Sequence, residues 1–251
     1  MLVDATVLVT GASSGIGRAC AEAFAAAGAR LLLCARRTDR LAELAGKFDT
    51  EVHTFALDVR DRAAVEATFA DLPPDWRAID VLVNNAGLAA GLEPFHEGDA
   101  DDWDRMVDTN IKGLLYVTRA VTPGMVTRGR GHVVNIGSIS GRESYAGAAV
   151  YCATKASVTL LTRGLLLDLL GTGVRVSTVD PGMTETEFSQ VRFHGDRDRA
   201  DRVYRGVTPL SAEDVAETVV WVADRPAHVQ VSELVLLPAD QASARDFARR
   251  G

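Results

Sequence analysis

Short apolar runs alternate with longer helical stretches along most of the chain. The apolar runs predict β-strands over residues 6–10, 30–35, 51–56, 79–83, 132–136, 174–179 and 234–237. Several of them, such as VLVT and LLLCA, are apolar without alternation, which is typical of strands covered by helices on both faces. The pattern predicts an α/β fold in which a doubly wound parallel sheet of about seven strands lies between two layers of helices.

Alanine- or leucine-rich segments between these runs predict the helices. They cover residues 18–27, 39–47, 62–71, 100–128, 151–170 and 213–224, and Gly28 and Gly171 stand where two of them should end. The sequence has no internal repeat, low-complexity tract or linker. Residues 1–251 are therefore predicted to form a single domain.

One segment interrupts the alternation. Residues 183–211 are polar and rich in Arg and Asp. In open α/β sheets, loops beyond the carboxyl ends of the strands commonly cover the ligand crevice. We therefore expect residues 183–211 to be a lid over the substrate, and residues 243–251 to be a polar tail.

Composition narrows the classes of partner and ligand. The net charge of −7 at pH 7 disfavours a nucleic-acid backbone or an anionic membrane surface, because both attract positive surfaces. No apolar run is long enough to span a membrane. Cys20, Cys34 and Cys152 form no C-x-x-C pair and the five histidines show no ligand spacing, so neither a disulfide framework nor a metal site is expected. A cytoplasmic location is the expectation.

A glycine-rich turn follows the first predicted strand. Residues 10–17 read TGASSGIG, and a helix is predicted to start at once. Glycines allow close approach, and the bare N–H groups of a helix start attract a pyrophosphate. The spacing G-x-x-x-G-x-G differs from the common dinucleotide fingerprint, and a purely structural turn is the alternative.

The end of the second predicted strand indicates which dinucleotide binds. Folds that prefer NAD usually place an acidic residue there to hold the ribose, whereas this chain has Arg36 and Arg37. Guanidinium groups can bind a 2′-phosphate, so NADP(H) is the expected cofactor. The alternative is that both arginines only solvate a helix start, which is the wrong helix end for cations.

Two further motifs follow the third and fourth predicted strands. Asp58 could accept a hydrogen bond from the adenine amino group, and the run NNAG over residues 84–87 places small residues against the ribose. An Asx turn is the competing explanation for each.

The candidate chemistry lies near residue 151. Tyr151 and Lys155 stand four apart on a predicted helix, so they share one face. A neighbouring ammonium stabilises a phenolate, which makes the pair a candidate acid and base. Ser138 closes the preceding strand and could bind a substrate oxygen. Asn110 lies in an apolar helix, where its amide needs a task or is a helix-bending core residue.

Together these motifs resemble the short-chain dehydrogenase/reductase superfamily, over residues 6–241. The motifs are TGASSGIG, the LDV of Asp58, NNAG, Asn110, Ser138, YCATK at 151–155 and the PG of Pro181 and Gly182. The resemblance implies a Rossmann-type fold, an oxidoreductase acting on CH–OH groups, a homotetramer, and a tetrad in which Tyr151 is the general acid or base. Lys155 would lower the pKa of Tyr151, Ser138 would position the substrate oxygen, and Asn110 would support a water relay.

The same resemblance implies which residues bind NADP(H). They are Gly11, Ser13, Ser14, Gly15, Ile16, Gly17, Arg36, Arg37, Asp58, Val59, Asn85, Ala86, Gly87, Tyr151, Lys155, Pro181, Gly182, Thr184 and Thr186.

A narrower resemblance indicates the substrate. The segment PGMTETEFSQVRF, which starts at Pro181, and the ending LLPADQ are similar to NADP-dependent 3-hydroxy acid dehydrogenases, which include serine and allo-threonine dehydrogenases. Ser138, Tyr145 and Arg192 are the expected substrate contacts, with Arg192 as a clamp for a carboxylate. Arg192 could instead form a structural salt bridge or a subunit contact. A broad carbonyl reductase and a non-catalytic NADP-sensing module are the alternative functions.

Overall fold

The computed structural model describes residues 2–250 and has a parallel sheet at its centre. The strands follow the spatial order β3-β2-β1-β4-β5-β6-β7, and every neighbouring pair is parallel. Their bounds are β1 (Thr6–Thr10), β2 (Arg30–Ala35), β3 (Val52–Ala56), β4 (Val81–Asn84), β5 (Gly131–Ile136), β6 (Val174–Pro181) and β7 (Glu233–Leu236). The prediction of a doubly wound sheet of about seven strands is confirmed.

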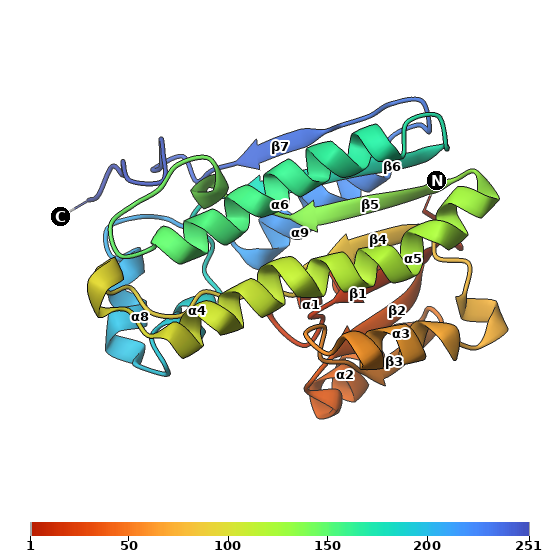
Figure 1. Ribbon diagram of the computed structural model, residues 1–251, viewed down its shortest axis with the longest axis horizontal. Helices are drawn as coiled ribbons and strands as arrows, with labels where there is room; N and C mark the ends of the chain where they lie inside the picture. Colours follow the sequence, from red (N-terminus) through yellow and green to blue (C-terminus); the bar gives the residue numbers. More distant parts are fainter. Residues whose placement is uncertain (1, 251) are drawn as a thin grey trace.

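Helices cover both faces of this sheet, so most strand side chains are buried (Figure 1). On one face, the core includes α1 (Gly15–Ala26), α2 (Thr38–Ala45) and α9 (Ala212–Ala223). On the other face, it includes α3 (Arg62–Ala70), α5 (Leu114–Arg128) and α6 (Ala149–Asp168). Two separate apolar cores, one on each face, explain why the strand sequences show no alternation. No helix within residues 2–250 is long and apolar enough to cross a bilayer.

The predicted helix over residues 100–128 is divided in the structure. It consists of α4 (Ala100–Val107), a π-helical turn η3 (Asp108–Gly113) and α5. A π-helical turn adds a residue to the helical repeat and is frequent at functional sites. In this chain the wide turn carries Asn110.

The segment over residues 183–211 forms two short helices that the sequence pattern did not predict. They are α7 (Phe188–Arg192) and α8 (Arg197–Tyr204), and a bridge between Thr184 and Leu210 closes the base of the segment. The polar residues that follow position 242 fold back beside it, where Arg250 N–H donates to the Gly206 carbonyl.

The strand order creates a crevice at the carboxyl edge of the sheet. The chain leaves β1 toward β2 on one side, whereas β4 lies on the other side of β1. The loops after β1 and β4 therefore diverge, and open α/β sheets bind ligands at this switch point.

Candidate active site

A cavity of about 560 Å³ opens at this edge of the sheet. Its lining includes every residue predicted to bind cofactor or substrate except Gly17. It also includes three of the four tetrad residues. The fourth, Asn110, lies behind the wall. The predicted residues in the lining are Gly11, Ser13, Ser14, Gly15, Ile16, Arg36, Arg37, Asp58, Val59, Asn85, Ala86, Gly87, Ser138, Tyr145, Tyr151, Lys155, Pro181, Gly182, Thr184, Thr186 and Arg192.

Gly17 packs the glycine-rich turn against the loop that follows β4. A Cβ at this position would come within 2.3 Å of Asn85 Nδ2 and 2.5 Å of the Gly11 carbonyl oxygen. Asn85 Nδ2 donates to the Thr10 carbonyl at 2.9 Å, and the Asn85 N–H donates to Thr10 Oγ1 at 3.0 Å. Gly17 therefore has a packing role, and Nδ2 of Asn85 holds the turn.

The start of α1 retains free donors. Ser14 is the N-cap residue, but its side chain caps no backbone N–H, and the first turn holds no acidic residue. A helix start without a cap and with a positive dipole end is suited to an anion. Gly15 has φ +52°, a left-handed conformation that glycine adopts without strain.

The two predicted phosphate ligands have different surroundings. Arg37 donates through Nε to Ser13 Oγ at 3.2 Å and through Nη2 to Ser14 Oγ at 2.6 Å. Its third contact is an ion pair with Glu187 at 3.0 Å. Arg36 lines the cavity, is exposed and has no ion pair within residues 2–250.

Glu187 links the segment over residues 183–211 to this edge of the cavity. Its Oε1 also pairs with Arg40 Nη1 at 2.7 Å. Hydrogen bonds from Arg40 and Arg37 lower the pKa of Glu187 against the opposing effect of burial. The sequence motifs did not identify Glu187, because its partners are some 150 positions away along the chain.

Asp58 has a protein partner that the sequence reasoning missed. Arg60 donates through Nη2 to Asp58 Oδ2 at 2.6 Å and through Nε to both carboxylate oxygens. These hydrogen bonds lower the pKa of Asp58. Its Oδ1 also accepts from the Arg60 N–H, which is an Asx-turn contact. The only available signal was an arginine two positions after an aspartate in the sequence.

Tyr151 lies in the wall of the cavity with its side chain buried at 7% exposure. Burial raises the pKa of its phenol above the ordinary value, and the nearby Tyr145 adds to the rise. A hydrogen bond with Ser138 and the positive charge of Arg192 act in the opposite direction. The charge on Lys155 is not among the largest influences on this pKa, so the expected lowering by Lys155 does not appear.

Ser138 and Lys155 are held by backbone groups. Ser138 Oγ accepts from the Ser140 N–H at 3.1 Å at the start of the turn η4 (Ile139–Gly141). Lys155 Nζ donates to the Ile136 carbonyl at 2.8 Å. Burial lowers the pKa of Lys155 to about 8, and Asp180 opposes this shift.

Asn110 fixes the loop after β4 to α6. Its Oδ1 accepts from the Leu88 N–H at 2.8 Å, and its Nδ2 donates to the Leu88 carbonyl at 2.8 Å and to Thr154 Oγ1 at 3.0 Å. The side-chain amide is therefore fully engaged with the protein. Asn110 holds the wall of the site and is more than a core residue that bends a helix.

Arg192 reaches the cavity from α7. Its guanidinium lies 5.3 Å from the ring centroid of Tyr151 and 5.5 Å from that of Tyr145, and Nη2 donates to the Tyr145 hydroxyl at 2.8 Å. Within residues 2–250 no carboxylate forms an ion pair with it, so the alternative of a structural salt bridge in this chain is wrong. The arrangement places a cation with spare donors beside the buried phenol.

Comparisons with known proteins agree with this geometry. The family model described as short chain dehydrogenase matches residues 5–197. NADP-dependent 3-hydroxy acid dehydrogenase YdfG of Salmonella typhi is 51% identical over 239 residues, which cover 95% of this chain and 96% of the relative. Sulfoacetaldehyde reductase 2 of Chromohalobacter salexigens is also 51% identical over 239 residues, covering 94% and 95% of the two chains.

A solved structure is similar over almost the whole chain. The closed form of serine dehydrogenase complexed with NADP⁺ is 47% identical, covers 98% of this chain and 100% of its own, and superposes with a TM-score of 0.93. The matched motifs, the sheet order and the extent of these similarities lead to one conclusion. The chain belongs to the short chain dehydrogenase family.

Proposed function

We propose that this protein is an NADP(H)-dependent dehydrogenase of small 3-hydroxy acids. One observation carries the choice of substrate class: the Arg192 guanidinium lies 5.3 Å from the Tyr151 ring, inside the cavity and without a carboxylate partner in residues 2–250. The names of relatives that are about half identical support the same class.

The cavity fits a phosphorylated dinucleotide. The uncapped start of α1 and the close packing at Gly17 leave backbone N–H groups for a pyrophosphate. Arg37 and Arg36 supply guanidinium groups for the additional phosphate of NADP. NADP(H), when bound, accepts or supplies the hydride of the reaction.

Tyr151 is proposed as the proton donor in carbonyl reduction and the proton acceptor in alcohol oxidation. Its raised pKa keeps the phenol protonated at neutral pH, which suits the donor role. Ser138 contributes a hydroxyl at the same place and would orient the substrate oxygen. The buried ammonium of Lys155 supplies positive charge beside the proposed cofactor ribose.

Arg192 is proposed to bind the substrate carboxylate. A guanidinium has five N–H donors, and the contacts with Tyr145 and the Gly91 carbonyl use only part of them. The remaining donors can form the paired hydrogen bonds that a carboxylate accepts. A neutral ketone would leave these donors without a partner, which argues against the broad carbonyl reductase.

Replacing Arg192 tests the substrate class. We expect Arg192→Ala to lower kcat/KM for serine and 3-hydroxyisobutyrate about 100-fold, and to change kcat/KM for a neutral ketone only slightly. Sulfoacetaldehyde belongs in the same substrate panel, since a sulfonate is also an anion that Arg192 could bind. Equal losses for acids and ketones would refute the clamp.

Replacing Tyr151 tests the proposed chemistry. Tyr151→Phe should retain NADPH binding, measured by fluorescence titration, and lose turnover by several orders of magnitude. Turnover close to that of the parent protein would contradict the role of Tyr151. Absence of turnover in the unmodified protein with every substrate would favour the NADP-sensing module.

We further propose a cytoplasmic homotetramer. Free, buried Cys20, Cys34 and Cys152 are compatible with a reducing compartment. Apolar side chains of α6 are exposed, namely Leu160 at 68% and Leu167 at 73%, and Leu170, in the turn after α6, is exposed at 79%. An exposed apolar helix face supports assembly with other copies of the chain.

A further inference from the structure

A buried carboxylate lies beside the residues proposed to act on the substrate. Asp180 is the last residue but one of β6, and its side chain is fully buried. The strand register pairs Val179 with Ile136, and the Gly137 N–H donates to the Val179 carbonyl. A Cβ on Gly137 would come within 1.9 Å of Asp180 Oδ1. The carboxylate thus occupies the space that any side chain at position 137 would need.

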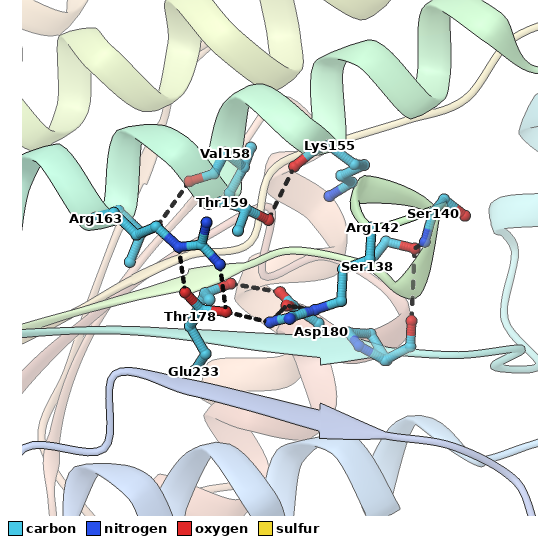
Figure 2. Close-up of polar contacts among 12 residues, drawn as sticks. Ser138, Ser140, Arg142, Lys155, Val158, Thr159, Arg163, Thr178, Asp180 and Glu233 are labelled. Carbon is cyan, nitrogen blue, oxygen red and sulfur yellow. Dashed lines mark hydrogen bonds and ion pairs between the residues drawn. The ribbon is translucent and has the colours of Figure 1, made fainter. Parts of the chain in front are cut away.

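Two residues hold the Asp180 carboxylate in place (Figure 2). Thr178 Oγ1 donates to Oδ1 at 2.6 Å, and Arg142 donates to Oδ2 through Nε at 3.0 Å and Nη2 at 2.8 Å. On the outer side, Arg142 also pairs with Glu233, which in turn pairs with Arg163. A buried carboxylate is costly unless it is paired and hydrogen-bonded, and these contacts meet both needs.

Lys155 is a buried cation without an ion pair of its own. Its Nζ donates to the Ile136 carbonyl, and no acidic side chain of residues 2–250 forms a salt bridge with it. Figure 2 shows its side chain extending from α6 toward the strand ends that carry Asp180. The negative charge of Asp180 raises the pKa of Lys155 and so opposes the larger effect of burial.

The other elements that surround Lys155 bring few ionisable side chains close to it. The loop after β4 presents Gly87, whose Cβ position lies 3.7 Å from Nζ, and behind it the neutral amide of Asn110. Tyr151 lies one turn earlier on the same helix. Asp180 is the acidic residue whose charge acts on Lys155, and it is itself paired with Arg142.

We propose that Asp180 is a positioning residue of this site: its carboxylate offsets the buried charge of Lys155 and fixes, through Arg142, the turn that carries Ser138. The proposal rests on the proposed function for its biological meaning. The effects of Asp180 on Lys155 and on the turn that carries Ser138 can be tested without any substrate.

The second part of the proposal follows from the position of Arg142. This residue directly follows η4, whose first turn is capped by Ser138. The ion pair between Arg142 and Asp180 therefore joins the far end of the turn to β6, while Ser138 Oγ donates to the Pro181 carbonyl at 3.5 Å at its near end. With both ends tied to β6, the Ser138 hydroxyl has a defined position.

The protonation of Lys155 can be measured directly by NMR. The chain has three lysines, Lys47, Lys112 and Lys155, so a sample labelled with ¹³C at lysine Cε gives three resonances. Lys47→Arg and Lys112→Arg assign the two exposed ones. In the ligand-free protein we expect Lys155 to titrate near pH 8, and in Asp180→Asn we expect its midpoint to fall by about one pH unit or more.

Two further variants control for the change in net charge. Glu233→Gln removes one negative charge from the outer side of Arg142 and should move the midpoint of Lys155 much less than Asp180→Asn does. Arg142→Gln removes the cation that compensates Asp180, so it should move the midpoint upward. This opposite sign keeps the proposal testable if Asp180→Asn fails to fold.

The outcomes separate this inference from the proposed function, because the titration requires no turnover. A Lys155 midpoint that is equal in Asp180→Asn and the parent, or that falls in Arg142→Gln, would overturn the inference. NADPH affinity by fluorescence should weaken above the Lys155 midpoint in each folded variant. An affinity that does not change at this midpoint would contradict the proposed role of Lys155 in cofactor binding, which is a failure distinct from that of the titration.

Discussion

Buried ionisable side chains at the site have pKa values displaced in opposite directions. Burial raises the pKa of Tyr151 and lowers that of Lys155 to about 8, since loss of water disfavours the charged form of each. At neutral pH the phenol is protonated and the lysine is largely charged. As pH rises, Lys155 therefore loses its charge before the phenol of Tyr151 loses its proton.

This difference predicts the pH dependence of the reaction. Lys155 is charged below its pKa and neutral above it, so kcat/KM for NADPH should fall as pH rises through about 8. Tyr151 stays protonated over that range. A pH series of kcat/KM for NADPH at saturating carbonyl substrate measures this, and a profile that stays flat to pH 10 would contradict it.

Glu187 pairs with the guanidinium of Arg37, which is proposed to bind the additional phosphate of NADP. Glu187→Gln removes this competition from Arg37, so NADP⁺ should bind about two- to fivefold more tightly, in line with the small free energy of an exposed ion pair. NAD⁺, which lacks the phosphate, should bind equally to both proteins and is the control. Weaker NADP⁺ binding to the variant would mean that Glu187 supports the bound state.

At the level of single residues, the sequence predicted which residues belong to the site better than it predicted their contacts. Motif spacing placed Ser138, Tyr151 and Arg192 in one predicted site, and the structure brings them to one cavity. It did not reveal that Asp58 is bound by Arg60 or that Glu187 reaches Arg37. The pair of Glu187 with Arg37 joins residues 150 positions apart, which no local pattern encodes, and the pair of Asp58 with Arg60 depends on side-chain conformations that the residue spacing alone does not determine.

Among the elements, η3 shows how local geometry departs from a regular helical period. Apolar spacing predicted one helix over residues 100–128, and the strand predictions fell within about two residues of the observed ends. The π-helical turn over residues 108–113 was not predicted, because one additional residue scarcely alters the hydrophobic pattern. The short helices α7 and α8 were missed because polar Arg/Asp-rich segments carry no apolar period.

The contacts of η3 predict a large stability effect. Asn110→Ala removes three buried hydrogen bonds and leaves the N–H and carbonyl of Leu88 without their partner. We expect the free energy of unfolding to fall by about 3 kcal/mol, measured by urea denaturation. Thr154→Val removes only one of these contacts and should cost less. Equal stability of Asn110→Ala and the parent would mean that water replaces the amide.

For the whole molecule, the order of the strands explains why distant motifs meet. Because all seven strands are parallel, the residues that follow β1, β4, β5 and β6 lie at one edge of the sheet. The strands and their succession along the chain could be predicted from the sequence, and the resemblance to the family implied a Rossmann-type, doubly wound sheet. The arrangement of residues 183–211 could not, since it depends on tertiary contacts.

The exposed apolar face of α6 gives a prediction about assembly. Leu160 and Leu167 are seven residues apart and lie on the same side of the helix. A double change of these residues to glutamate should shift the proposed tetramer to smaller species, as seen by light scattering after size-exclusion chromatography. A matched change at Trp221, which is exposed on α9, should leave the mass unaltered. An unchanged mass in the α6 variant would rule out this face as the interface.

The path of residues 241–250 has a practical consequence. Ala244, Phe247 and Arg249 form part of the cavity rim, and Arg249 donates to the carbonyls of Val203 and Arg205. β1 begins at the opposite edge of the sheet, as Figure 1 shows. If the enzyme were immobilised on a support through the edge of the sheet where β1 begins, the cavity would stay open to the medium. Immobilisation through residues 241–250 would obstruct the cavity entrance.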